Sequence, residues 1–194
     1  MKGQAPKQAA SQILAQQPAE LDPRSTQILG GVRLVVFDVD GTLTDGAVTV
    51  TEHGESLRFA VIDGFAIKEL QKAGIHVAWI SGRSSPATAA RAKDLGVTEV
   101  HLGQVHKTRA LAALQERLGI APGETAAIGD DLPDLSLRPR IAFLAAPANA
   151  RSEVAARADL VTHAAGGHGA VREFVEHILR AQGRWQAIVG AFAG

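Results

Sequence analysis

Cysteine is absent from this chain of 194 residues. Its absence excludes disulfide bridges, thiolate nucleophiles and cysteine-ligated zinc together. A chain without thiols is also compatible with a reducing compartment, so we expect a cytoplasmic protein.

An excess of charge of either sign is missing too. Lysine plus arginine equals aspartate plus glutamate, at 20 each, so no net field draws the chain toward nucleic acid or an anionic membrane. Residues 1–20 lack the apolar run of about 7–15 residues of a secretory signal. Nothing approaches the roughly 18 uninterrupted apolar residues of a membrane span. We expect a soluble protein whose function depends on local chemistry.

The chain has enough apolar material for one substantial core, because 46% of its residues are hydrophobic. We expect this core within residues 32–183. Residues 1–31 contain three prolines and a Gly30-Gly31 pair, which predicts an N-terminal extension with a short helix near Ser11 to Gln17. Residues 184–194 are expected to form a C-terminal tail.

Short apolar runs alternate with helical patterns from Val32 onward, which indicates βαβ units in a doubly wound parallel sheet, a Rossmann-like α/β fold. The predicted strands are "VRLVVF", "HVAWI", "TEVHL", "TAAIG", "IAFLA" and "ADLVT". The predicted helices are 64–73, 85–95, 107–118, a short one at 132–137, 150–157 and 170–182. Residues 47–59 alternate in polarity on both sides of His53-Gly54 and predict a β-hairpin before the first of these helices.

Polar side chains follow three predicted strands where each strand ends. Asp38 follows the first strand, Ser81 the second, and Asp130 with Asp131 the fourth. In an open parallel sheet this edge is the ligand crevice. A single acid such as Asp63 is better explained as a turn or helix cap, but independent caps have no reason to follow three strands in this way.

Other sites for these acids and glycines do not fit. An EF-hand loop starting at Asp38 would place Leu43 where glycine is required and Thr49 where glutamate is required. No G-x-x-x-x-G-K-[ST] motif occurs, and "GGHG" at 166–169 lacks the dinucleotide-binding spacing. The histidines have no metal-ligand spacing and are interpreted as core or surface residues.

Four motifs occur in order along the chain: "DVDGT" at 38–42, Ser81 within "ISGR", Lys107, and "GDDLPD" at 129–134. Through them the sequence resembles the haloacid dehalogenase-like phosphohydrolase superfamily. The resemblance implies that Asp38 is a nucleophile toward phosphorus and that Asp40 acts as general acid and base. An aspartyl-phosphate would split a slow hydrolysis into two easier steps, and one acid two residues away can serve both proton transfers.

The other motif residues suit the charges of a phosphate site. Mg²⁺ is expected on the carboxylates of Asp38 and Asp130 and the backbone carbonyl of Asp40. Lys107 would balance the negative charge of the acids and the phosphate. The expected outer residues, which would orient water molecules or Lys107, are Asp131 and Asp134. The expected phosphate- or substrate-binding residues are Gly41, Ser81, Gly82 and Arg83.

The spacing leaves no room for a cap domain over this site. Residues 42–63 hold only the hairpin, and residues 83–106 hold one helix and one strand. A capless site is open to water, so we expect a macromolecular substrate or neighbouring subunits to close it. In the second case the exposed hairpin would be an assembly element.

The resemblance extends to one capless family, the 3-deoxy-D-manno-octulosonate 8-phosphate phosphatases of lipopolysaccharide precursor synthesis, nearly end to end from Val32 to Trp185. Its segments include "DGAVTVTEHGESLRF", "GDDLPDL" and "GGHGAVREFVEHILRAQGRW". It implies a small sugar-acid phosphate as substrate, and the charge balance already predicts no nucleic acid or membrane partner. It also implies a homotetramer with a barrel of hairpins and active sites completed across interfaces. The tail from Trp185 would either cover a neighbour's site or be a frayed terminus.

Two positions depart from that family's pattern. The usual Arg-Asp-Gly is Ile62-Asp63-Gly64 here, and the usual Gly-Gly-Arg-Gly is residues 166–169 with His168. Neither isoleucine nor histidine can replace an arginine fork on a carboxylate. The substrate has therefore shifted if those positions contact it, and need not have shifted if they contact a subunit. Arg83, and less directly Arg91, remain to bind a carboxylate or phosphate.

Three functions stay open at this point. The first is phosphatase activity on the 3-deoxy sugar-acid phosphate, and the second is phosphatase activity on another small phosphate such as a nonulosonate 9-phosphate. The third is a non-catalytic binding or assembly role. The complete motif set argues against the third function, because a retired site does not need all of these groups.

Overall fold

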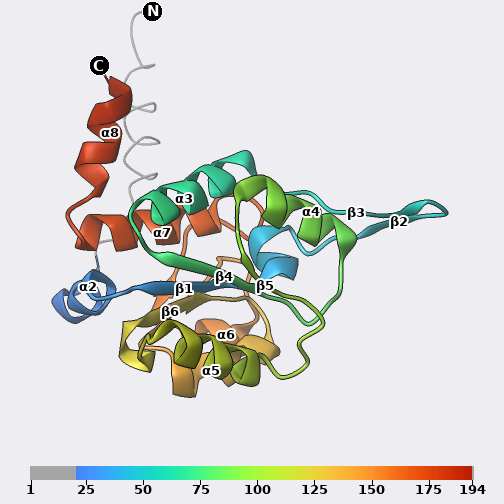
Figure 1. Cartoon of the computed structure of the whole chain (residues 1–194), viewed down its shortest axis with the longest axis horizontal. Coiled ribbons are helices and arrows are strands. Elements are labelled where there is room, and N and C mark those ends of the chain that lie inside the picture. The colour runs from blue at the N-terminus through green and yellow to red at the C-terminus, as the bar shows by residue number, and fades with distance from the viewer. Residues whose placement is uncertain (1–20, 194) are drawn as a thin grey trace, which may run out of the picture.

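The structure is a computed structural model that describes residues 21–193. Its centre is a six-stranded sheet in the order β5-β4-β1-β6-β7-β8, with every neighbouring pair parallel (Figure 1). The strands are β1 (Leu34–Phe37), β4 (His76–Ile80), β5 (Glu99–His101), β6 (Thr125–Ile128), β7 (Phe143–Ala146) and β8 (Leu160–Val161). The chain goes from β1 to β4 on one side and later returns to β6 on the other. The ligand crevice of such a fold lies at this reversal.

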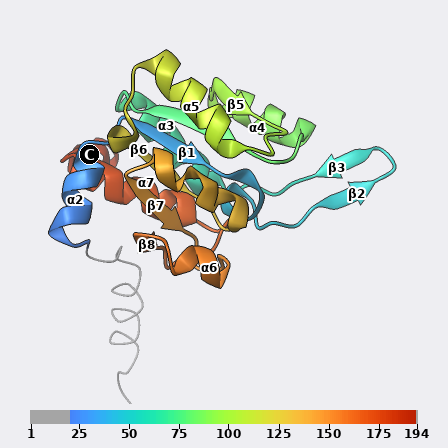
Figure 2. The same cartoon turned by 90° about the horizontal axis from the view of Figure 1, so that it is seen from below.

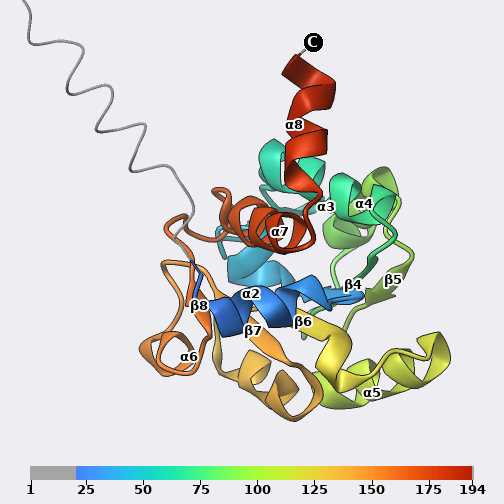
Figure 3. The same ribbon diagram turned by 90° about the vertical axis from the view of Figure 1, so that its left-hand side faces the viewer.

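Helices cover both faces of the sheet (Figures 1 and 3). One face carries α2 (Pro23–Gly30), α3 (Val61–Lys72), α4 (Pro86–Leu95) and α7 (Ala170–Ala181). The other face carries α5 (Lys107–Leu118), the 3-10 segments η2 (Pro122–Glu124) and η3 (Leu132–Arg140), and α6 (Ser152–Ala155). Among residues 21–193 no helix is long and apolar enough to cross a membrane.

Strand β1 shows how the sequence builds this layered core. All four of its residues are buried. Because successive side chains of a strand point to opposite faces, Val35 and Phe37 join the core under α3 and α7, while Leu34 and Val36 join the core over α5. A strand buried on both faces reads as a continuous apolar run.

The β-hairpin consists of β2 (Thr49–Thr51) and β3 (Gly54–Ser56) and projects away from the body (Figures 1 and 2). All of β2 is exposed, including Val50 at 78%. At its base Arg58 forms an ion pair with Asp45 at 2.5 Å. The hairpin therefore projects from the body with all of β2 open to solvent.

The structure confirms the predicted fold class, with each predicted strand present. Helix α5 has the predicted bounds, while α3 begins three residues early, at Val61, and α6 covers only Ser152–Ala155 of the predicted 150–157. Both termini differ more. The expected helix near Ser11 to Gln17 lies outside the described residues.

Part of the predicted N-terminal extension is packed structure. Helix α2 begins at Pro23, and Asp22 caps it by accepting hydrogen bonds from two backbone N–H groups. Leu29 is fully buried in the core. The packed body therefore begins before the expected boundary at residue 32, because Leu29 lies in the core, Leu21 and Ile28 pack against it, and α2 contacts α7. The expected tail is also regular: it forms α8 (Trp185–Ala193), which projects from the body (Figures 1 and 3) although Trp185 at its start is buried in the core.

Candidate active site

The predicted clusters meet at the carboxyl edge of three neighbouring strands. Asp38 follows β1, Ser81 follows β4 and Asp130 lies just after β6. Lys107 is the first residue of α5. The parallel order of the strands thus collects residues from four distant segments of the chain.

A buried ion pair lies at the centre of the site. Lys107 Nζ donates to Asp38 Oδ1 at 2.5 Å and to Asp134 Oδ1 at 2.7 Å, and the lysine is 4% exposed. Burial lowers the pKa of Lys107, but the two carboxylates outweigh burial and raise it overall. Burial and the charge of Asp134 raise the pKa of Asp38 well above its ordinary value, although Lys107 opposes them. One lysine therefore compensates only part of the negative charge.

Asp130 completes a cluster of three carboxylates. One oxygen each from Asp38, Asp130 and Asp134 lies within 4.8 Å of the others. Burial and the charge of Asp134 raise the pKa of Asp130 too. Carboxylate oxygens at this spacing are the donor set of a hard divalent cation such as Mg²⁺. The residues present therefore fit a bound magnesium ion.

Gly41 leaves the space that the Asp130 carboxylate occupies. A Cβ at Gly41, whose φ is +97°, would lie 2.2 Å from Asp130 Oδ2. Thr42 Oγ1 donates to Asp130 Oδ1 at 3.2 Å. The N–H of Gly41 lies 3.3 Å from Thr44 Oγ1 and is thus engaged within its own turn, η1 (Val39–Leu43) and the residue after it. Close packing against Asp130 is sufficient reason for a glycine here.

The two acids after Asp130 have different surroundings. Asp134 is buried, and its Oδ2 accepts from the backbone N–H groups of Asp130 at 3.1 Å and Asp131 at 3.2 Å. Asp131 is exposed, and its carboxylate accepts from Leu132 N at 2.7 Å. Of the two predicted outer acids, the structure brings only Asp134 to Lys107.

Asp40 accepts hydrogen bonds from two residues of the "ISGR" motif, Ser81 and Arg83. Its Oδ2 accepts from Ser81 Oγ at 3.2 Å, and its Oδ1 accepts from Arg83 Nη1 at 2.9 Å. Arg83 Nη2 also donates to Glu55 Oε2 at 2.5 Å, and Glu55 lies on β3. Arg83 therefore ties the hairpin to the active site. Sequence reasoning missed Glu55, whose only signal is its place in the hairpin. Gly82 is exposed, with open space around it.

The positions that depart from the family pattern lie on the surface. Ile62 on α3 is 51% exposed. His168 is exposed and lies near enough to Asp63 to lower the pKa of that carboxyl electrostatically. Arg91, the other predicted substrate-binding arginine, pairs with Asp94 at 2.6 Å and packs over Gly64, where a Cβ would lie 2.5 Å from Arg91 Nη2. These contacts place Arg91 between α3 and α4.

Comparison with known proteins agrees with this geometry. Residues 58–137 match the haloacid dehalogenase-like hydrolase family. The chain is 40% identical over 166 residues to the 3-deoxy-D-manno-octulosonate 8-phosphate phosphatase of Salmonella typhi, which covers 84% of this chain and 88% of that protein.

Solved structures give the same result. The structure of the Moraxella catarrhalis 3-deoxy-D-manno-octulosonate 8-phosphate phosphatase, in complex with a magnesium ion, a phosphate ion and a KDO molecule, has a TM-score of 0.84 and 39% identity. That match covers 87% of this chain and 98% of the other. The Yersinia pestis phosphatase has a TM-score of 0.83 and 36% identity, over 84% of this chain and 89% of the other. This chain belongs to the 3-deoxy-D-manno-octulosonate 8-phosphate phosphatase family of haloacid dehalogenase-like hydrolases.

Proposed function

We propose that this chain is a Mg²⁺-dependent phosphatase that hydrolyses 3-deoxy-D-manno-octulosonate 8-phosphate, the substrate named for its relatives. The observation that carries the proposal is the buried contact of Lys107 with Asp38 and Asp134, next to Asp130 at the strand ends. This arrangement supports phosphoryl transfer because it combines a nucleophile, a cation and a metal-binding carboxylate pair. The family resemblance implies that this reaction belongs to lipopolysaccharide precursor synthesis.

Two residues carry the proposed covalent chemistry. The Asp38 carboxylate attacks phosphorus, the bond from phosphorus to the sugar oxygen breaks, and Asp40 gives its proton to the leaving alkoxide. Asp40 then takes a proton from a water molecule, whose oxygen attacks phosphorus and releases phosphate and the free Asp38 carboxylate. Both Asp40 oxygens accept hydrogen bonds from Ser81 and Arg83 in the structure. The acid role therefore requires one of these donors to turn toward the substrate.

The proposed magnesium ligands are the carboxylates of Asp38 and Asp130 and the backbone carbonyl of Asp40. Magnesium, when bound, supplies a Lewis acid that offsets the charge of the phosphoryl group. Asp134 is the proposed outer residue that holds Lys107 in place, since it contacts the lysine directly. Asp131, which caps a backbone N–H instead, keeps at most a role through water.

Ser81 and its neighbours are the proposed phosphate-binding group. The Ser81 hydroxyl, the exposed backbone of Gly82 and the Arg83 guanidinium lie together on the loop after β4. Gly41 is proposed to contribute mainly the space that lets the backbone approach the phosphate, because its N–H is already engaged.

A second substrate is favoured by one specific observation. Ile62 and His168 stand where the family usually has arginines, and both are exposed. If subunits meet there, the octulosonate substrate is unaffected. If the substrate's carboxylate binds there, another small phosphate, such as a nonulosonate 9-phosphate, becomes the better substrate.

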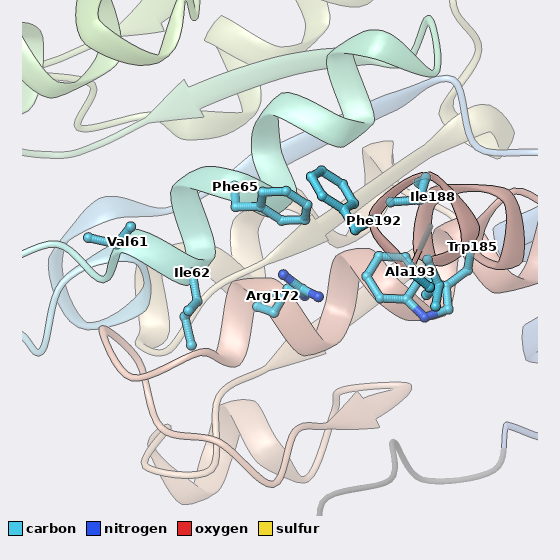
Figure 4. Close-up of a pocket in the computed structure, with 9 residues that line it drawn as sticks. Val61, Ile62, Phe65, Arg172, Trp185, Ile188, Phe192 and Ala193 are labelled. Carbon is cyan, nitrogen blue, oxygen red and sulfur yellow. The ribbon is translucent and has the colours of Figure 1, made fainter.

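We also propose a homotetramer whose hairpins form a shared barrel and whose active sites are completed by neighbouring subunits. Exposed apolar side chains support this proposal. A groove of about 580 Å³ lies between α3 and α8, with Arg172 on its wall between Phe65 and Trp185 (Figure 4). Val61 at 80% and Phe192 at 71% exposure line this groove. Helix α8 is the segment proposed to reach a neighbour's site. The proposed location is the cytoplasm, in keeping with a chain without cysteine.

A substrate panel tests the proposed function. Phosphate release is measured with the octulosonate 8-phosphate, a nonulosonate 9-phosphate and common sugar phosphates, with and without Mg²⁺. We expect the highest kcat/KM for the octulosonate, and no turnover by Asp38→Asn. A higher kcat/KM for the nonulosonate 9-phosphate would identify that compound as the substrate instead of the octulosonate. Turnover by Asp38→Asn equal to that of the wild type would contradict the proposed nucleophilic role of Asp38. Undetectable turnover by the wild type with every phosphate would favour a non-catalytic role.

A further inference from the structure

The loop between β8 and α7 lies directly against the turn that follows Asp38. Gly166 and Gly167 in this loop are both buried. A Cβ on Gly166 would lie 1.7 Å from Gly41 O, and one on Gly167 would lie 2.4 Å from Asp45 N. These neighbours are backbone atoms, which cannot move aside by changing a rotamer. The glycine pair is therefore the condition for this close backbone contact.

A hydrogen bond fixes the contact. Gly167 N donates to Thr42 O at 2.9 Å. Thr42 in turn donates through its hydroxyl to Asp130 Oδ1 at 3.2 Å, and Gly41 packs against the same carboxylate. One side of the turn thus faces Asp130, while its backbone is held by the glycine pair.

The glycine loop is itself anchored at several points. Asn149 Oδ1 accepts from Gly166 N at 2.8 Å. The Glu173 carboxylate accepts from the backbone N–H groups of His163 at 3.0 Å and Ala164 at 3.1 Å. The segment that contains Asn149 also contacts the backbone of Asp130, because Arg151 N donates to Asp130 O at 2.9 Å. The turn, the glycine loop and the segment that contains Asn149 are therefore linked in a closed circuit of contacts that begins and ends at Asp130.

We propose that Gly166 and Gly167 are positioning residues that hold the Gly41–Asp45 turn, and through Thr42 the Asp130 carboxylate, in the geometry that binds Mg²⁺. This inference rests on the proposed function for its catalytic consequence, but its effect on metal binding is independent of the substrate. Partners that orient a metal ligand typically change metal affinity about 10- to 100-fold when they are lost. The sequence motif 166–169 thereby gains a role that does not depend on the side chain at position 168.

Two matched pairs of variants test the proposal. Gly166→Ala is compared with Gly123→Ala, because neither glycine has a positive φ but only Gly166 is crowded. Gly167→Ala is compared with Gly183→Ala, because both have φ of +68° but Gly183 has nothing within 4 Å. Within each pair the two glycines have the same sign of φ, and only Gly166 or Gly167 would meet the backbone of the turn.

The readouts are the Mg²⁺ dissociation constant, measured by isothermal titration calorimetry, and kcat and KM for the phosphate substrate. We expect Gly166→Ala and Gly167→Ala to weaken Mg²⁺ binding about tenfold or more and to lower kcat, while their controls keep the wild-type values. A purely structural role would lower the melting temperature and leave the metal affinity unchanged. That result in a folded Gly166→Ala variant would overturn the proposal.

A milder pair covers the case in which the alanine variants do not fold. Asn149→Ala removes the acceptor for Gly166 N, and Asn149→Asp keeps an acceptor. We expect Asn149→Ala to weaken Mg²⁺ binding by a few fold and Asn149→Asp to restore it. Wild-type affinity in Asn149→Ala would contradict the proposal. A wild-type chain inert toward every phosphate would refute the proposed function alone, and the calorimetric comparison would still decide the role of the glycines.

Discussion

Lys107 Nζ lies 2.5 Å from Asp38 Oδ1, in a pair whose side chains are 4% and 8% exposed. An ion pair removed from water so completely must be held by additional contacts. Asp134 provides one at 2.7 Å. The lysine thus separates two carboxylates that would otherwise repel each other across a buried space.

Lys107→Met keeps the length of the side chain and removes its charge. We expect kcat to fall about 100-fold or more, because a preorganised charge at a phosphoryl-transfer site contributes on this order. Steady-state phosphate release measures the effect. Lys68→Met, at an exposed lysine on α3, is the control and should keep wild-type kcat. A kcat within threefold of wild type for Lys107→Met would show that the lysine has no catalytic role.

Magnesium should stabilise the folded chain. One oxygen each from Asp38, Asp130 and Asp134 lies within 4.8 Å of the others, and Lys107 contacts only two of these carboxylates. A bound cation therefore relieves their repulsion. At 100 times the dissociation constant the stabilisation is about 2.7 kcal/mol, or roughly 5–10 °C in melting temperature. Differential scanning calorimetry with Mg²⁺ and with EDTA measures it, and EDTA should also abolish phosphate release.

Asp130→Asn should lose most of this thermal shift. Asp131→Asn, the same change at the next residue, should keep it, because the Asp131 carboxylate is exposed and caps Leu132 N. If both variants lose the shift equally, Asp131 is closer to the metal than its contacts indicate.

The sequence predicts the layers and the strand ends because their signals are local. A buried strand such as Leu34–Phe37 needs an apolar run, and Asp38 interrupts that run where the strand ends. Lys107 begins α5 at the predicted residue. Residue types and spacing are sufficient at these positions, since the parallel order of the strands then brings their ends together.

Other parts of the site depend on contacts that no local pattern encodes. Glu55 on β3 contacts Arg83 on the loop after β4, 28 residues further along the chain. The sequence predicts the same outer role for Asp131 and Asp134. Only the fold of η3 determines that Asp134, and not Asp131, contacts Lys107. Helix α2 is unpredictable for the same reason: Leu29 is an unremarkable residue until α7 offers it a buried position.

The stability of the chain should depend on pH through Asp63. This carboxylate is 1% exposed and accepts from Arg172 N at 2.7 Å, at the start of α7. Burial raises its pKa to about 6, although backbone hydrogen bonds from Arg172 and Gly169 oppose the rise. A raised pKa favours the protonated folded form. The contribution of Asp63 is therefore full below its unfolded pKa of about 3.8 and is lost as the pH rises through about 6.

Asp63→Asn should remove this dependence. We expect the free energy of unfolding of the variant, relative to wild type, to increase by about 2–3 kcal/mol between pH 4 and pH 7. Urea denaturation at several pH values measures the difference. Asp94→Asn, at an exposed carboxylate on α4, is the control. A constant difference across this range would mean that Asp63 titrates normally.

Arg83 should be sensitive to changes that keep its charge. It donates to Asp40 and to Glu55 through separate nitrogens, a geometry that lysine cannot reproduce. Arg83→Lys should raise KM about tenfold, corresponding to one lost charge-assisted hydrogen bond, with a smaller change in kcat. Glu55→Gln should shift KM in the same direction by a smaller factor. Glu52→Gln, in the same hairpin with its side chain 86% exposed, should match wild type; a wild-type KM for Arg83→Lys would exclude Arg83 from substrate binding.

Assembly should depend on the hairpin. Val50 is 78% exposed on β2, a strand without any buried residue, and exposed apolar strands of this kind are covered in stable proteins. Size-exclusion chromatography with light scattering should give a wild-type mass near four times 20.3 kDa. Val50→Lys should give smaller species and a lower kcat/KM, because the proposed sites need a neighbour. Val161→Lys, at a 42% exposed valine on the edge strand β8, should stay tetrameric and active. A fully active wild-type monomer would mean that the groove beside α8 and the open catalytic edge need no second subunit.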